Sequence, residues 1–132
     1  MFRSLAARIV LATLLLLFLV ATARAHHNMS AIFDFSDRVT VTGTLTKLDW
    51  RNPHIEFFVD TNTDKGVETW RYEGPAPAFF RERSVGKVDF ENVMGKTVTV
   101  EASRARDGSR WGLLRQITLS GDKTVSACPQ NC

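Results

Sequence analysis

The sequence predicts a mainly β protein whose single domain is a small five-stranded barrel with one short helix between the third and fourth strands. Two features indicate this fold class. Stretches in which apolar and polar residues alternate recur along the chain, as in strands with one buried face. The alternation is interrupted near Pro75 and Pro77 by a stretch of helical character. A plain β-sandwich with a crossover helix is the alternative that this pattern leaves open.

The first two strands are expected over residues 38–50 and 54–61, on either side of a turn at Asn52-Pro53. Gly43, in the middle of the first strand, predicts a bulge or a tight bend. The residues expected to face inward are Val39, Val41, Leu45, Ile55, Phe57 and Val59. Both strands are therefore predicted to be buried on one face only.

A polar stretch over residues 62–66 predicts a hairpin turn into a third strand, residues 67–73, in which Trp70 and Tyr72 share one face. Because proline is well tolerated in the first turn of a helix, a short helix is expected next, over residues 77–84.

The last two strands are expected from Gly95 onward and over residues 110–119, joined by a turn at Asp107-Gly108. The residues expected to face inward are Val98, Val100, Ala102, Trp111, Leu113, Ile117 and Leu119. The order of three strands, a helix and two strands, with a long first strand, matches the five-stranded OB barrel.

Residues 1–25 have the features of a cleavable signal peptide. Arg3 and Arg8 accompany an apolar run over residues 9–21, and residues 23–25 form the small-x-small pattern of a cleavage site. An uncleaved membrane anchor is the alternative, but a spanning helix needs about 20 apolar residues. We therefore expect a periplasmic or secreted protein with no membrane span after cleavage. Its expected parts are an N-terminal arm (26–37), the barrel domain (38–121) and a C-terminal tail (122–132).

Cleavage would change the charge of the protein. The full chain has 17 Lys and Arg against 14 Asp and Glu, a formal net charge of +3. Three basic residues, Arg3, Arg8 and Arg24, belong to the signal peptide, whereas every acidic residue follows it, so the mature chain has no net charge. Because it lacks the basic surface that a phosphate backbone requires, a nucleic-acid partner is not expected.

Cys128 and Cys132 both lie in the last five residues of the chain. Because disulfides persist in oxidising compartments, the favoured interpretation is a small terminal loop closed by a disulfide between them. The alternative is a thiol site for a soft metal such as Cu(I), or for redox chemistry.

The three histidines occupy places where they could bind a metal ion. His26 and His27 begin the predicted mature chain, and His54 begins the second strand. The α-amine and imidazole of His26 can chelate one ion, and His27 or His54 would complete the planar nitrogen set that Cu(II) prefers. Glu56 could add a carboxylate or a hydrogen bond, and Met29 a thioether for Cu(I). The alternative is a solvated N-terminus and a His54 that only hydrogen-bonds the turn.

These residues predict a small binding protein that holds copper or another divalent metal. A second hypothesis is a metal-free module that binds a protein or a small ligand through Trp50, Phe58, Trp70 and Tyr72. These rings are expected to lie off the core, Trp50 by way of a register shift at Gly43. OB barrels bind ligands across the corresponding strands, and exposed rings stack on ligands. Packing of the rings against the core or beneath the helix is the alternative.

The sequence contains no recognisable catalytic constellation. It has neither a glycine-rich phosphate loop nor a G-x-S-x-G elbow, and its carboxylates are scattered. We therefore expect a protein that is not an enzyme.

Several of these motifs together resemble a known family. They are His26-His27-Asn28, Phe33-Asp34, Gly43, the block Trp50-Arg51-Asn52-Pro53-His54, Glu73-Gly74 and Ala105-x-Asp107-Gly108. The combination looks like a bacterial secreted family known as domain of unknown function 6152. The resemblance spans nearly the whole mature chain and implies a signal peptide followed by one compact β-rich domain, with no established activity, substrate or cofactor.

The chain departs from that family pattern in two places. Asn28 stands where the pattern usually has serine, and the tail with Cys128 and Cys132 looks like an addition. The histidines that match the motif are His26, His27 and His54, so the resemblance singles them out as a unit without implying their chemistry.

Overall fold

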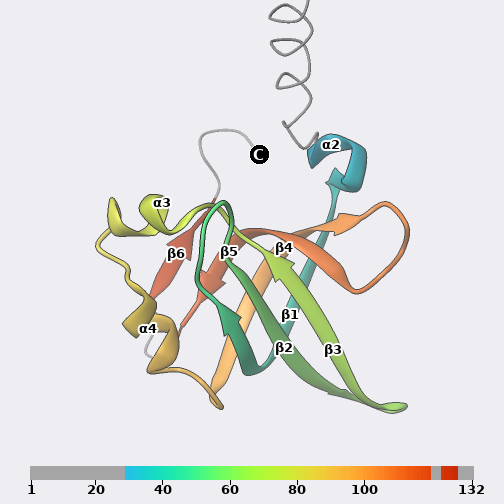
Figure 1. Ribbon diagram of the computed structural model, residues 1–132. Coiled ribbons are helices and arrows are strands. Elements are labelled where there is room, and N and C mark those ends of the chain that lie inside the picture. The colour runs from blue at the N-terminus through green and yellow to red at the C-terminus, as the bar shows by residue number, and fades with distance from the viewer. Residues whose placement is uncertain (1–28, 120–122, 128–132) are drawn as a thin grey trace, which may run out of the picture.

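The protein is described from a computed structural model over residues 29–119 and 123–127. It is mainly β, with short helices (Figure 1). The strands are β1 (Phe33–Asp49), β2 (Glu56–Thr63), β3 (Gly66–Glu73), β4 (Thr97–Ala105), β5 (Trp111–Thr118) and β6 (Thr124–Ser126). The helices are α2 (Met29–Ile32), α3 (Pro77–Arg81) and α4 (Lys87–Glu91). The predicted signal peptide, His26, His27, Cys128 and Cys132 lie outside the described residues.

The strands form one sheet in the order β3-β2-β1-β4-β5-β6, with antiparallel neighbours. In addition, the end of β3 pairs in parallel with the start of β5, through Arg71–Glu73 and Trp111–Leu113. The pairings among β1 to β5 therefore form a closed cycle. The sixth strand, β6, was not predicted, because three residues are too short for a recognisable alternation.

The long strand β1 is shared between two partners. It pairs with β4 from Phe33 to Thr44 and with β2 from Thr44 to Asp49. The change of partner brings Gly43 so close to β2 that a Cβ atom there would lie 2.3 Å from the carbonyl oxygen of Asp60. The expected glycine is thus explained by a close approach of two backbones.

β1 has one register shift against β4, between Asp34 and Arg38, and one against β2, at Thr46 between Leu45 and Lys47; neither lies at Gly43, where one was predicted. The extra residue at Thr46 reverses the alternation, so that Leu48 and Trp50 both pack against the core.

The segment after β3 forms two short helices instead of the single helix predicted over residues 77–84. Pro77 lies in the first turn of α3, which ends at Arg81, and α4 follows after Ser84 adopts a positive φ of 56°. Phe80 of α3 and Phe90 of α4 are fully buried, and their rings lie 5.3 and 5.2 Å from that of Trp50. Figure 1 shows these two helices together along one side of the molecule, away from α2.

A bulge in β5 makes the inward face of that strand differ from the predicted one. Arg115 is the extra residue, because Glu101 pairs with Gln116 and Ala102 with Leu114. Leu114 is therefore in the core, where Leu113 was expected. The buried Arg115 guanidinium lies 3.3 Å from the hydroxyl of Ser103 and 3.6 Å from the Glu101 carboxylate.

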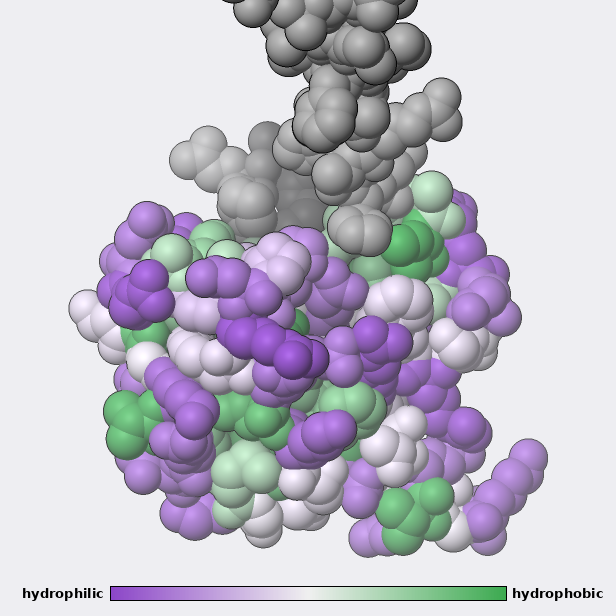
Figure 2. Space-filling view, viewed as in Figure 1, coloured by the Kyte–Doolittle hydropathy of each residue, from purple (hydrophilic) through white to green (hydrophobic). Residues whose placement is uncertain are grey.

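The inward faces predicted for β1 up to Leu45, for β2 and for β4 are confirmed, as are Ile117 and Leu119 beyond the bulge in β5. The buried core contains Val41, Leu45, Ile55, Phe57, Val59, Val98, Val100, Ala102, Ile117 and Leu119, all of them predicted. The face seen in Figure 2 is mainly hydrophilic, with apolar residues in small separate patches. Within the described ranges, no helix is long and apolar enough to cross a membrane.

Candidate functional site

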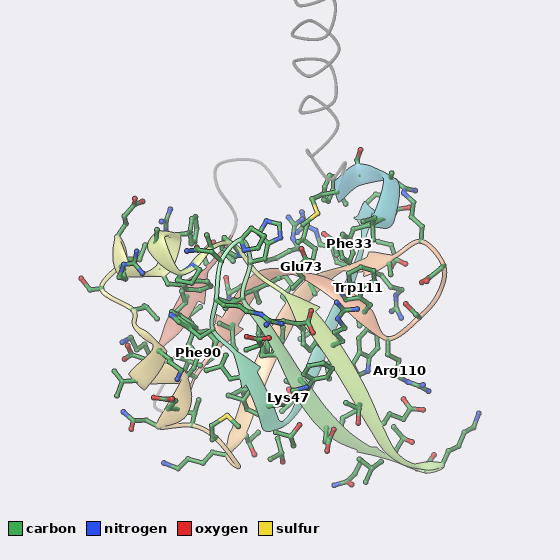
Figure 3. All side chains as sticks on the ribbon, viewed as in Figure 1. Phe33, Lys47, Glu73, Phe90, Arg110 and Trp111 are labelled. Atoms are coloured by element: carbon green, nitrogen blue, oxygen red, sulfur yellow. The ribbon has the colours of Figure 1, made fainter. Side chains whose placement is uncertain are left out.

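A pocket with a volume of about 390 Å³ opens where the loop between β1 and β2 meets the end of β3 and the helix α2. Its walls include Met29, His54, Glu56, Arg71, Glu73 and Trp111. A smaller pocket of about 210 Å³ shares Met29 and His54 with it. Three residues predicted for a metal site, Met29, His54 and Glu56, are therefore brought together. In Figure 3, Glu73, Trp111 and Phe33 lie beneath α2.

His54 makes its polar contact with Glu73, which the sequence analysis did not single out. The Nδ1 atom of His54 lies 2.6 Å from Oε1 of Glu73, a short hydrogen bond. The side chain of His54 is 35% exposed and that of Glu73 is 17% exposed. The register of the β2–β3 hairpin could have revealed this contact, because Glu73 pairs with Glu56, two residues beyond His54.

The backbone holds His54 and Glu73 side by side. The amide of Gly74 donates to the carbonyl of Ile55 over 2.9 Å, and the amide of Ile55 donates to the carbonyl of Pro75 over 3.2 Å. The two segments approach so closely that a Cβ atom at Gly74 would lie 2.9 Å from Cγ1 of Ile55. A side chain at position 74 would therefore crowd Ile55, which explains the glycine after Glu73.

The other carboxylates of the pocket are paired with arginines. Arg71 lies 2.6 Å from Glu56, and its guanidinium lies 4.5 Å from the centroid of the Trp111 ring. Arg51 lies 2.7 Å from Asp49. Glu56 was expected to contribute a carboxylate or a hydrogen bond beside His54. The carboxylate that bonds His54 is instead that of Glu73, because Glu56 is paired with Arg71.

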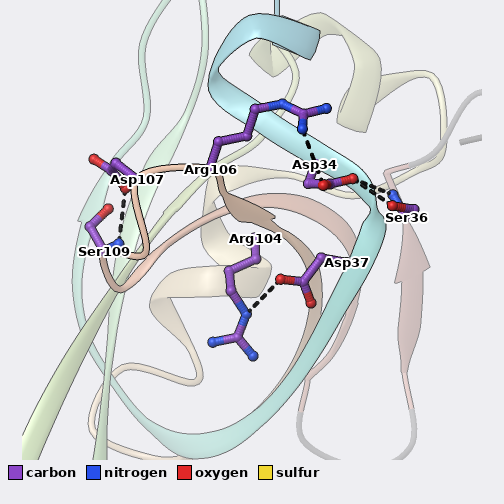
Figure 4. A network of polar contacts seen from close by, with 7 residues as sticks. All are labelled: Asp34, Ser36, Asp37, Arg104, Arg106, Asp107 and Ser109. Carbon is purple, nitrogen blue, oxygen red and sulfur yellow. Dashed lines mark hydrogen bonds and ion pairs between the residues drawn. The ribbon is translucent and has the colours of Figure 1, made fainter.

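Arg106, the residue after β4, bonds to α2 and to Asp34 at the start of β1, and Figure 4 shows the contact with Asp34. Its Nε donates to the carbonyl of Ser30 over 2.9 Å, and its Nη1 lies 3.1 Å from Oδ2 of Asp34. Hydrogen bonds from Ser36, together with the Arg106 charge, hold the pKa of Asp34 below its usual value. Asp34 therefore stays ionised at neutral pH, and α2, with Met29, stays attached to β4.

The chain matches the model of a family of unknown function, DUF6152, over residues 14–116. The chain belongs to the DUF6152 family. Comparisons with curated proteins and with solved structures found no match. The block from Trp50 to His54 that carried the resemblance forms one wall of the pocket in this DUF6152 protein, apart from Trp50, which packs against the core.

The metal-site hypothesis is only partly covered by the structure of this DUF6152 protein. Among residues 29–119 and 123–127, no group of three or more His, Cys, Asp or Glu side chains could hold a metal ion. His26 and His27 lie outside those ranges, so of the three histidines the structure places only His54.

Most of the aromatic side chains expected to form an exposed ligand-binding face are buried instead. Trp70 is 7% exposed and Tyr72 is fully buried, because they pair with the inward residues of β2. Burial raises the pKa of the Tyr72 phenol, so that it stays protonated. Trp50 packs against the core as well. Phe58 is half-buried on the outer face, with the ammonium of Lys47 5.0 Å from its ring centroid.

Proposed function

We propose that the protein is an exported, non-enzymatic binding protein that holds a copper ion between its mature N-terminus and His54. The observation that carries this proposal is the position of Met29. This residue lies two positions after His27 in the sequence, and its side chain lines the same pocket as His54. An N-terminus created by cleavage after Ala25 would therefore begin three residues before a residue that lines this pocket.

The proposed ligands are nitrogen atoms. The α-amine and imidazole of His26 chelate the ion, and imidazoles from His54 and His27 complete a tetragonal set, which suits Cu(II). The Met29 thioether is the ligand available to Cu(I), since soft sulfur ligands favour that ion. In this proposal the protein binds the metal and carries out no reaction of its own.

The charge pattern of the pocket supports copper over hard cations. Ca²⁺ and Mg²⁺ require several carboxylate or carbonyl oxygens. The carboxylates of Asp49 and Glu56 are each within 2.7 Å of an arginine, and that of Glu73 is bonded to His54. The pocket therefore presents imidazole rather than free carboxylate to an incoming ion.

The proposal extends to the fold and the compartment. The closed cycle of pairings among β1 to β5, with helices between β3 and β4, supports assignment as an OB-like barrel. Residues 1–25 support export, because they have the charged start, apolar run and small-x-small end of a signal peptide.

A metal-free binding module is the second candidate. The pocket of about 390 Å³ falls in the size range of small-molecule sites, roughly 300–1,000 Å³, and has an aromatic wall at Trp111 with polar groups beside it. In this case the ligand would occupy the pocket, because Trp70 and Tyr72 are buried and offer no stacking surface.

Equilibrium dialysis of the chain that begins at His26 separates the two candidates. We expect the wild-type chain to retain Cu(II) at micromolar free metal. His54→Gln and His26→Ala should each bind at least about tenfold more weakly, since each removes one imidazole ligand. Glu68→Gln, on β3 but bonded to Arg110, is the matched control. Retention of copper by none of the chains, or equally by all of them, would contradict the proposal.

A further inference from the structure

We propose that Glu73 is a positioning residue that fixes the His54 ring so that Nε2 is the atom offered to the metal. The inference rests on the proposed function for the identity of the ion, but the orientation of the ring can be measured without any metal.

The first step is the direction of the hydrogen bond. An ionised carboxylate can only accept, so the 2.6 Å contact between His54 and Glu73 places the proton on Nδ1. In a neutral imidazole the other nitrogen then carries the lone pair. The tautomer of His54 is therefore set by Glu73, with Nε2 left as the coordinating atom.

The second step is the rigidity of Glu73. It is the last residue of β3, where the strand is paired on one side with Glu56 of β2 and on the other with Leu113 of β5. Its side chain is 17% exposed, about half as much as that of His54. Strand pairing on both sides and limited access of water hold the carboxylate in place, so that it orients the ring rather than following it.

The third step is that the other carboxylates among the described residues of the pocket bond arginines and not His54. Glu56, the other glutamate, is bonded to Arg71 over 2.6 Å, and Arg71 is in turn held over the Trp111 ring. Asp49 is bonded to Arg51. A histidine ligand that donates its second N–H to a carboxylate is a recurring arrangement in metal proteins, and loss of the carboxylate typically costs about 10–100-fold in metal affinity.

The experiment compares the wild-type chain from His26 with three variants. Glu73→Leu removes the acceptor, Glu73→Gln keeps an acceptor oxygen without the charge, and Glu68→Gln changes the glutamate of β3 that is bonded to Arg110. The first readout is the tautomer of His54 in the metal-free protein, from the ¹⁵N chemical shifts of Nδ1 and Nε2 at mildly alkaline pH. The second is the affinity for Cu(II), measured by competition with a chelator.

We expect the Nδ1–H form in the wild type, in Glu73→Gln and in Glu68→Gln, and its loss in Glu73→Leu. Copper affinity should fall about 10–100-fold in Glu73→Leu, less in Glu73→Gln and not in Glu68→Gln. An Nε2–H tautomer in the wild type, or wild-type affinity in Glu73→Leu, would overturn the inference. The expected tautomers in a wild-type chain that binds no copper would support the orientation of His54 by Glu73 and refute the proposed function.

Discussion

Replacing Gly43 with alanine tests how β1 is shared between β2 and β4, the arrangement that positions the loop carrying His54. A Cβ atom at this position would lie 2.3 Å from the carbonyl oxygen and 2.9 Å from the carbonyl carbon of Asp60, and 2.9 Å from Cγ1 of Val59. The first two atoms are backbone and cannot rotate away. Alanine therefore requires β1 and β2 to separate next to the pairing of Thr44 with Asp60.

The expected cost of Gly43→Ala follows from these contacts. Overpacking in a close-packed region costs about 1–3 kcal/mol, and the weakening of one backbone hydrogen bond in the ladder adds about 1 kcal/mol. We therefore expect the free energy of unfolding to fall by about 2–4 kcal/mol, a large share of the roughly 5–15 kcal/mol of a typical domain. Urea unfolding, followed by tryptophan fluorescence, measures this change.

Gly86→Ala is the matched control for this experiment. The nearest atoms to a Cβ at Gly86 lie at 3.9 Å, and the φ angle of −115° is open to alanine. Its effect should stay below about 1 kcal/mol, the scale of changes at a helix N-cap. If Gly43→Ala unfolds within about 0.5 kcal/mol of the wild type, the scale of ordinary surface substitutions, the shared-strand geometry is refuted.

Two further predictions concern ion pairs. Arg106→Ala removes the side-chain bonds from Arg106 to Ser30 and Asp34. It should weaken Cu(II) binding by no more than about fivefold, because these contacts are exposed. Arg104→Ala, the control on the same strand, should leave the affinity unchanged, and equal affinities for the two variants would contradict the role of Arg106. The Lys123 ammonium and the amide of Gly86 lower the pKa of Asp89. The ionised Asp89 carboxylate therefore stabilises the folded state fully above the ordinary carboxyl pKa, and this contribution is lost as the pH falls through the lowered pKa. Asp89→Asn should therefore reduce the free energy of unfolding by about 1 kcal/mol at neutral pH, and the difference should shrink below about pH 4; a difference independent of pH would contradict this assignment.

Local alternation in the sequence predicts most of the sheet but misses its irregularities. Phe57, Val59, Val98 and Val100 face inward as expected, because a strand with one buried face repeats every two residues. A bulge adds one residue and reverses that phase, and nothing in the local pattern marks it. This is why Leu114, and not Leu113, is in the core before the bulge at Arg115.

Cross-strand pairing carries information that periodicity within single strands does not. The pairing of Trp70 with Val59 and of Tyr72 with Phe57 places both aromatic rings on the buried face. The turn over residues 62–66 predicted this hairpin, and extending its register would have moved these rings from the expected ligand face to the core. The same extension places Glu73 diagonally opposite His54.

The rest of the pocket depends on contacts between distant segments. Arg106 bonds to Ser30, 76 residues earlier in the chain, and this is one of the contacts that hold α2 where Met29 lines the same pocket as His54. A side chain that reaches across the fold to a backbone carbonyl leaves no periodic signal. The sequence could therefore indicate His54 and Met29 as candidates, whereas their convergence on one pocket required the tertiary structure.

Native mass spectrometry of the protein purified from the exported fraction of an expressing bacterial host tests the copper site most directly. It reports the N-terminal residue, the state of Cys128 and Cys132 and any bound metal in one spectrum. We predict the mass of a chain that begins at His26 with a single copper ion bound after exposure to micromolar free copper. A chain that begins at His26 but carries no copper under these conditions would contradict the central claim, as would a protein that retains residues 1–25.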